Sequence, residues 1–219
     1  MAGRIRQFSS FAFIICVVAL IVAITFCGCT TNTSTTANQS MPVSSAEKFK
    51  VNQAAVDEVA RLASLTAQNK TTVDDFAAIE NMTSGDDAAT DELTEITTMV
   101  KYGEFEHASH GLSFLESYFE TGKKLICPGH SLSHFYIFTK HNETQLAADN
   151  LAEAKENLDA WIPKAQNFTE QYPGPVSFDV ILTHIQTDIK NIDAGNRTAS
   201  NEEVDFLSNE ASICVEADN

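Results

Sequence analysis

The chain has 219 residues, with 14 basic against 30 acidic side chains and a formal net charge of −16. Such an acidic surface repels nucleic acid, whose binding needs clustered Lys and Arg, so nucleic acid is excluded as a partner. From Cys29 onward about 190 residues remain, which is enough for one domain with a sizeable core.

The first element is an apolar segment, residues 8–28, that holds 21 consecutive uncharged residues after Arg4 and Arg6. A basic start, an apolar middle and a small residue before a cysteine are typical of an export signal rather than of a folded element. Gly28-Cys29 resembles the lipobox of prokaryotic lipoproteins, in which the cysteine is lipidated and becomes the mature N-terminus. The resemblance implies lipidation of Cys29 and a location at the cell membrane, facing outward.

Two other interpretations of the same segment stay open. An apolar span of about 20 residues can cross a bilayer as an uncleaved anchor helix, with the arginines left inside. Cleavage without lipidation would instead release the chain. In all three cases the downstream domain faces outward, and in the first two it is tethered to the membrane.

A polar segment follows at residues 29–44, rich in Thr, Ser and Asn and almost free of large apolar side chains. Because it cannot bury a core, it is predicted to be a flexible stalk. The extracytoplasmic domain is predicted to span residues 45–219. Ser44 and Glu47 fit a capping box at the start of its first helix.

Apolar residues at helical spacing run through the whole predicted domain, and no segment alternates for long with a period of two. The fold class is therefore predicted to be all-α, a single helical bundle of about six to eight helices. Ala147 to Phe168 show the clearest spacing, and Pro163 marks a kink or an end within it. The predicted helices cover residues 45–68, 73–81, 87–101, 104–123, 130–140, 144–168, 180–195 and 202–215.

Cys127 and Cys214 are the only cysteines of the predicted domain. An even pair in an exported protein favours a disulfide. Closing a loop of about 87 residues is worth roughly 4 to 5 kcal/mol in the chain-entropy model. Two buried free thiols are the alternative.

Seven of the 14 asparagines lie in Asn-x-Ser/Thr sequons, which predicts N-glycosylation on exposed loops. The alternative is turn chemistry, since Asn and Thr are common at helix ends. A lipobox together with sequons indicates an archaeal surface lipoprotein. The candidate glycosylation sites are Asn32, Asn38, Asn69, Asn81, Asn142, Asn167 and Asn196.

No Cys-x-x-Cys pair, HExxH, phosphate loop or nucleophile elbow is found in the sequence, so an enzyme is not expected. His130, His134 and His141 fall on one face of a predicted helix. Antiparallel packing on the preceding helix would bring His141 towards His110. The resulting hypothesis is a transition metal bound by His110, His134 and His141, with histidines at the edge of the core as the alternative.

Together these features predict a membrane-tethered, glycosylated extracellular helical bundle with a non-catalytic binding or envelope-associated role. Its expected partners are the membrane, through the lipid or anchor helix, and a protein or component of the cell envelope. The contact surface is expected on the Phe114 and Tyr118 side of the helix at 104–123, or on an acidic helix face. The alternative is an extracytoplasmic metal- or redox-cofactor protein that uses the helix histidines.

Overall fold

The computed structural model describes residues 50–217, which belong to one compact unit, Glu47–Asn219. The apolar segment at 8–28, Cys29, the predicted stalk and the predicted cap at Ser44 and Glu47 lie outside the described residues. No helix between residues 50 and 217 combines the length and the apolar character needed to span a membrane.

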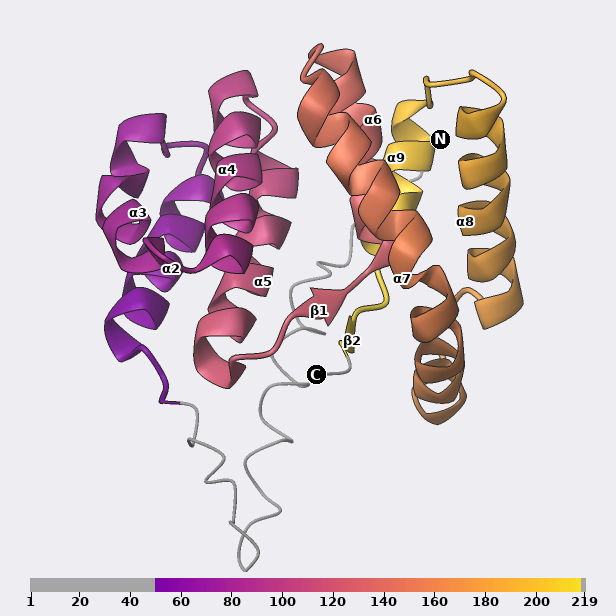
Figure 1. The fold of residues 1–219 in the computed structure, drawn as a ribbon, viewed down its shortest axis with the longest axis horizontal. Helices are drawn as coiled ribbons and strands as arrows, with labels where there is room; N and C mark the ends of the chain where they lie inside the picture. The colour runs from indigo at the N-terminus through magenta and orange to yellow at the C-terminus, as the bar shows by residue number, and fades with distance from the viewer. Residues whose placement is uncertain (1–49, 218–219) are drawn as a thin grey trace, which may run out of the picture. The chain divides into compact units, whose positions relative to one another are not determined.

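The described part of the chain confirms the all-α prediction, with eight α-helices, one 3₁₀ helix and two strands of two residues each (Figure 1). Both strands pair antiparallel, Leu125 with Glu216 and Ile126 with Val215. In chain order the elements are α2 (Gln53–Thr66), η1 (Val73–Phe76), α3 (Ala77–Thr83), α4 (Asp87–Tyr102), α5 (Phe105–Thr121), β1 (Leu125–Ile126), α6 (Pro128–Lys140), α7 (Thr144–Gln171), α8 (Phe178–Asp193), α9 (Asn201–Asn209) and β2 (Val215–Glu216).

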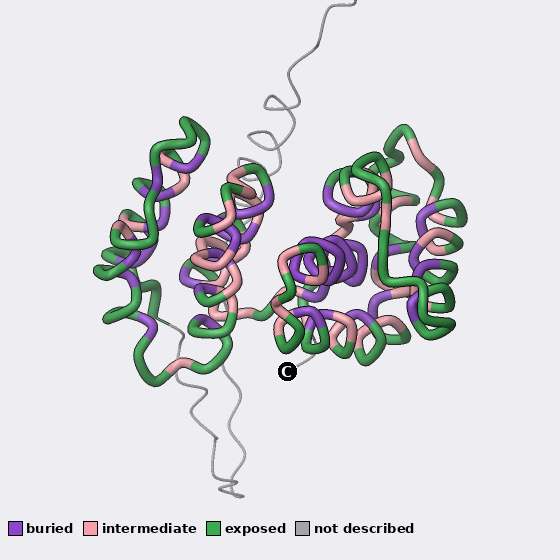
Figure 2. The backbone as a smooth tube through the Cα atoms, turned by 90° about the horizontal axis from the view of Figure 1, so that it is seen from above, coloured by how far each residue is buried: buried purple, intermediate pink, exposed green. Residues whose placement is uncertain are grey.

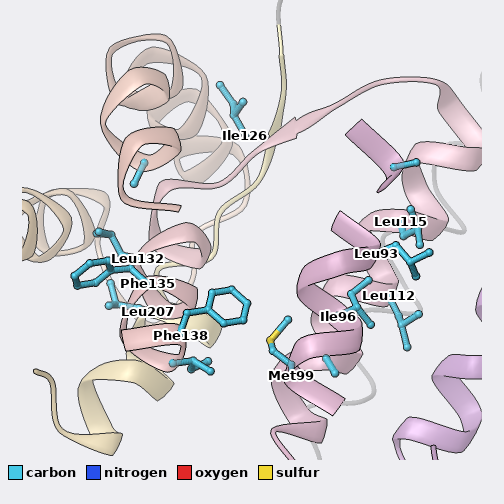
Figure 3. Close-up of a cluster of buried hydrophobic side chains, with 14 of the residues drawn as sticks. Leu93, Ile96, Met99, Leu112, Leu115, Ile126, Leu132, Phe135, Phe138 and Leu207 are labelled. Atoms are coloured by element: carbon cyan, nitrogen blue, oxygen red, sulfur yellow. The ribbon is translucent and has the colours of Figure 1, made fainter. Parts of the chain in front are cut away.

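The helices form two groups. In the first group α5 packs on α2 and α4, and in the second α6 packs on α7, α8 and α9. Figures 1 and 2 show the two groups on opposite sides of the unit, joined by the chain through β1. We call the boundary where α4 and α5 face α6 the junction. One hydrophobic cluster continues across it, and Met99 of α4 points toward Phe138 of α6 in Figure 3.

Helix α6 is the centre of the second group. Every residue from Pro128 to Phe138 is buried, because other helices cover α6 on several sides. Leu132, Phe135 and Phe138 are among the largest fully buried side chains of the described chain. The same helix also carries buried His, Ser and Tyr side chains, so polar groups enter the core together with apolar ones.

The last predicted helix, residues 202–215, is wrong in its second half. Helix α9 ends at Asn209, and Val215 and Glu216 form β2. The disulfide predicted between Cys127 and Cys214 is present, and the Trp161 indole N–H donates to the Ile213 carbonyl oxygen at 2.6 Å. The strand pairing, the disulfide and this hydrogen bond keep residues 210–216 from continuing α9, although their apolar spacing is helical.

Two other helix boundaries differ from the prediction. Helix α2 begins only at Gln53, where the side chain of Asn52 accepts a hydrogen bond from the Ala55 N–H and caps the helix. Helix α7 runs through Pro163 to Gln171 without ending. Pro163 and Asp159 are both exposed, so water can reach the Asp159 carbonyl that loses its usual N–H partner.

Gly129 lies where α6 comes closest to the C-terminal segment. A Cβ atom at this position would collide with the backbone carbonyl of Ala211, which cannot give way as a flexible side chain could. We therefore expect Gly129→Ala to lower the free energy of unfolding by about 1 to 3 kcal/mol, as overpacking does elsewhere. Urea denaturation measures this change.

The matched control is Gly174→Ala, since a Cβ at Gly174 meets nothing within 4 Å. We expect this control to change the free energy of unfolding by less than about 0.5 kcal/mol. Equal stabilities of the two variants would contradict the close packing of α6 on Ala211.

Candidate functional site

Four histidines meet at the junction, His107 and His110 from α5 and His130 and His134 from α6. Their ring centroids are 6.4 Å apart between His107 and His110, 6.4 Å between His110 and His130, and 4.0 Å between His130 and His134. All but the half-buried His110 are buried. We call these four residues the histidine cluster.

Hydrogen bonds fix the two ends of the histidine cluster to different helices. Nδ1 of His107 lies 3.1 Å from Oγ of Ser208 on α9. Nδ1 of His134 lies 2.8 Å from a carboxylate oxygen of Glu95 on α4, and Asn150 of α7 donates to the other oxygen of Glu95 at 2.7 Å. These bonds connect the two helix groups across the junction.

Burial determines the protonation of three rings of the histidine cluster, those of His107, His110 and His130. It lowers the pKa of His107 to about 4, assisted by the positive charges that His134 and His110 would carry. Burial likewise lowers the pKa of His110 and brings that of His130 well below its ordinary value. These three rings are therefore neutral at pH 7. Neither ring nitrogen of His130 has a hydrogen-bond partner.

The candidate metal ligands His110, His134 and His141 do not share one set of contacts. His141 places Nε2 at 2.8 Å from Glu104 and stacks on the Tyr102 ring at 4.2 Å. Within residues 50–217, no group of three or more His, Cys, Asp or Glu side chains is placed to hold a metal ion. Metal binding by the three histidines stays a prediction.

The contacts of His141 and His110 follow from how α5 and α6 are joined. A direct antiparallel hairpin predicts that His141 lies opposite residues near 112. Instead, β1 separates the two helices, and His141 meets Glu104 at the start of α5. His110 consequently meets His130 rather than His141.

A cleft with a volume of about 670 Å³ opens at the junction. Residues from the start of α5 and the end of α6 form two of its walls, and the α8–α9 loop and α9 contribute a third. The buried ring of His107 also lines it. Volumes of this order are typical of sites for small organic ligands.

The lining of the cleft carries both signs of charge. Its carboxylates belong to Glu104, Glu106 and Asp205, and its cations to Lys140 and Arg197. Burial would raise the pKa of Glu104, but hydrogen bonds from His141 and Lys140 outweigh this and lower it. Glu104 is thus an ionised, already partnered group, whereas Glu106, Asp205 and Arg197 are exposed.

The aromatic stripe of α5, formed by Phe114 and Tyr118, faces the junction. Both Phe114 and Tyr118 are half-buried, and the Phe114 ring lies edge-on to His130 at 4.3 Å. The Tyr118 hydroxyl donates to Asp86 at 2.8 Å. The stripe is therefore engaged within the unit, which does not leave it as a free contact surface.

The carboxyl groups of Asp188 on α8 and Glu203 on α9 form a pair next to Tyr136, a residue that lines the cleft. Burial raises the pKa of Asp188 to about 6, with further contributions from the charge and hydrogen bonding of Glu203 on α9. Asp188 is only 8% exposed, and its Oδ2 has no hydrogen-bond partner. His184 approaches Glu203 at 3.3 Å. A negative charge on Asp188 is therefore destabilising.

The predicted glycosylation sites within the described residues are all exposed: Asn69, Asn81, Asn142, Asn167 and Asn196. Asn32 and Asn38 lie outside those residues. Asn69 and Asn142 follow α2 and α6 with positive φ angles of 53° and 61°, the conformation in which Asn ends helices. Turn chemistry thus explains two of the sites, and glycan occupancy stays a prediction for all seven.

No protein-family model matches the chain, and no curated protein or solved structure is significantly similar to it. The interpretation of the site therefore depends on its own residues and geometry.

Sequence reasoning missed three groups that define the site. Glu95 and Ser208 are far from the histidines in sequence and meet them only through tertiary packing. Arg197 is in a loop, where periodicity gives no information. The histidine content of α5 and α6 was the signal that pointed to this region.

Replacing Asp188 should remove a source of pH dependence. The folded-state pKa of about 6 exceeds the unfolded value of 3.8, so the folded protein binds the proton more tightly. This contribution to stability is complete below pH 3.8 and is lost as pH rises through 6. We expect Asp188→Asn to raise the free energy of unfolding by about 1 to 3 kcal/mol at pH 7.5 and much less at pH 4.

Urea denaturation at the two pH values checks this expectation. Asp179→Asn, an exposed position on the same helix, is the control and should give equal small changes at both. The expected role of Asp188 would be disproved by an Asp188→Asn variant with wild-type stability at pH 7.5.

Proposed function

We propose that the protein is a membrane-tethered, outward-facing and glycosylated binding module that captures a small zwitterionic ligand, such as a short peptide, without catalysis. The observation that carries this proposal is the 670 Å³ cleft of mixed charge at the junction. Ligand sites are common where separately packed parts of a fold meet.

The charges of the cleft favour a ligand that carries both signs. Arg197 can pair with a carboxylate, and a guanidinium is well suited to two parallel hydrogen bonds. Glu106 and Asp205 can pair with an ammonium group of the same ligand. A ligand with only one kind of charge would face like charges on part of the lining.

Binding is favoured over catalysis by the state of the cleft carboxylates. A general acid or base works best with a pKa near the operating pH. The partners of Glu104 lower its pKa instead, and they occupy the carboxylate with structural bonds. This arrangement orients a fixed negative charge, which suits recognition.

The outward-facing location is supported by three kinds of observation. The apolar segment at 8–28 with Gly28-Cys29 resembles a lipoprotein signal. The Cys127–Cys214 disulfide is typical of oxidising compartments. The five sequons of the described residues present exposed asparagines.

The cleft proposal is tested by calorimetry with a library of short zwitterionic peptides. We expect at least one peptide to bind, and binding to weaken about tenfold when its termini are acetylated and amidated. Arg197→Ala, which keeps the Asn196 sequon intact, should weaken binding by a similar factor. Lys190→Ala, an exposed cation of α8 that does not line the cleft, is the control.

Equal binding of capped and uncapped peptides would contradict recognition by charge. If the protein is folded and no peptide of the library binds, short peptides are ruled out as ligands of the cleft.

The tether is tested by the N-terminal chemistry of the full-length protein produced in an archaeal host. We expect mass spectrometry to find a mature chain that starts at a lipid-modified Cys29, and the protein to partition into the detergent phase. A chain that still begins at Met1 would establish the anchor helix instead. An unmodified chain in the medium would establish simple secretion.

A further inference from the structure

A second, smaller cavity of about 70 Å³ lies at the junction and shares no lining residue with the cleft. Its walls come from α4 and α5 of the first group, from the connection around β1, and from α6 and α7 of the second group. The polar side chains among them include Glu92, His130 and Glu153.

Two of these side chains present buried polar atoms without partners. Both ring nitrogens of His130, a residue 5% exposed, lack a hydrogen bond, and so does Oε1 of Glu92. Burial raises the pKa of Glu92 well above its ordinary value, and the nearby carboxylates of Glu95 and Glu153 add to this, against the charge of Lys124. Unpartnered buried polar groups of this kind are destabilising, so a ligand that formed hydrogen bonds with them would bind more tightly.

The position of the Glu92 carboxyl depends on a glycine. A Cβ atom at Gly111 of α5 would lie 2.9 Å from Oε1 of Glu92 and 2.7 Å from Cγ1 of Ile96. The absence of a side chain at Gly111 therefore makes room for a carboxyl group between α4 and α5.

The remaining walls suit an alkylated cation. Phe114 and Tyr118 bring aromatic rings, and Leu115 and Leu125 bring aliphatic surface. Aromatic rings attract cations, most strongly where water is excluded. At the rim the Lys124 ammonium already lies 2.8 Å from a Glu153 oxygen, so this surrounding accommodates an ammonium group.

We propose that this cavity binds a small primary alkylammonium ion. The ammonium group donates one hydrogen bond to Glu92 Oε1 and one to a lone pair of the neutral His130 ring, and its alkyl chain contacts Phe114 and Leu115. The volume admits an ion of roughly two to four non-hydrogen atoms. Because an ammonium ion favours the carboxylate form of Glu92, any proton held by that carboxyl passes to solvent on binding.

Proton release on binding distinguishes an ammonium ligand from a cluster of ordered water molecules. The groups that face Glu92 are Glu95 on its own helix, Tyr118 on α5, Lys124 in the connection, His130 on α6 and Glu153 on α7. Ordered water adds no charge that would favour the carboxylate form of Glu92, whereas an ammonium ion does.

The test is calorimetry of the full-length protein with n-propylammonium chloride at pH 7.5, in two buffers of different ionisation enthalpy. We expect saturable binding accompanied by proton release, because burial raises the pKa of Glu92 in the free protein and the bound ammonium ion lowers it. n-Propanol and KCl, which lack the ammonium or the alkyl chain, should not bind. Binding without proton release, or equal binding of n-propanol, would overturn the proposal, and so would a lack of binding.

Glu92→Gln should weaken n-propylammonium binding roughly 30-fold or more, because a buried charge partner is lost. Gln has nearly the shape of Glu and introduces no buried charge, so the melting temperature of the variant without ligand should not fall below that of the wild type. Asp91→Asn removes an exposed charge one position earlier and should bind as the wild type does. Wild-type affinity in Glu92→Gln would refute the assignment. Peptide binding in the cleft is independent of this outcome.

Discussion

The burial of α6 is the constraint on which the rest of the domain depends. Its residues from Pro128 to Phe138 are all buried, yet the helix carries His130, His134 and Tyr136 among its apolar side chains. A buried polar group is stabilising only when another group satisfies it. Glu95 of α4 does so for one nitrogen of His134, and this requirement draws the first helix group against the second.

The junction consequently contains both apolar and polar side chains. Aliphatic and aromatic contacts continue across it, as Figure 3 shows around Met99 and Phe138, but imidazole and carboxyl groups interrupt them. Side chains in such a network must satisfy the geometry of their hydrogen bonds as well as pack closely. Both the cleft and the smaller cavity lie along this boundary.

The sequence was informative wherever a property depends on neighbours in the chain. The spacing of apolar residues identified α4 and α7 because helical periodicity is local, and the cysteine count identified the Cys127–Cys214 pair. Two-residue strands have no periodicity, so β1 and β2 could not be found in this way. Without β1, the packing of α5 on α6 was misaligned, and the partner of His141 was missed.

The unpartnered atoms of the junction connect packing to binding. Glu92 belongs to the first helix group and His130 to the second, and each is incompletely satisfied when the cavity holds no ligand. A ligand that forms hydrogen bonds with both Glu92 and His130 connects the two helix groups directly. Above its Kd, such a ligand stabilises the folded state by an amount that grows with the logarithm of the ligand concentration. Unsatisfied polar groups on and around α6 lower the free energy of unfolding, and a ligand bound at the junction offsets this loss. The contact between the two helix groups is therefore most stable when the ligand is bound.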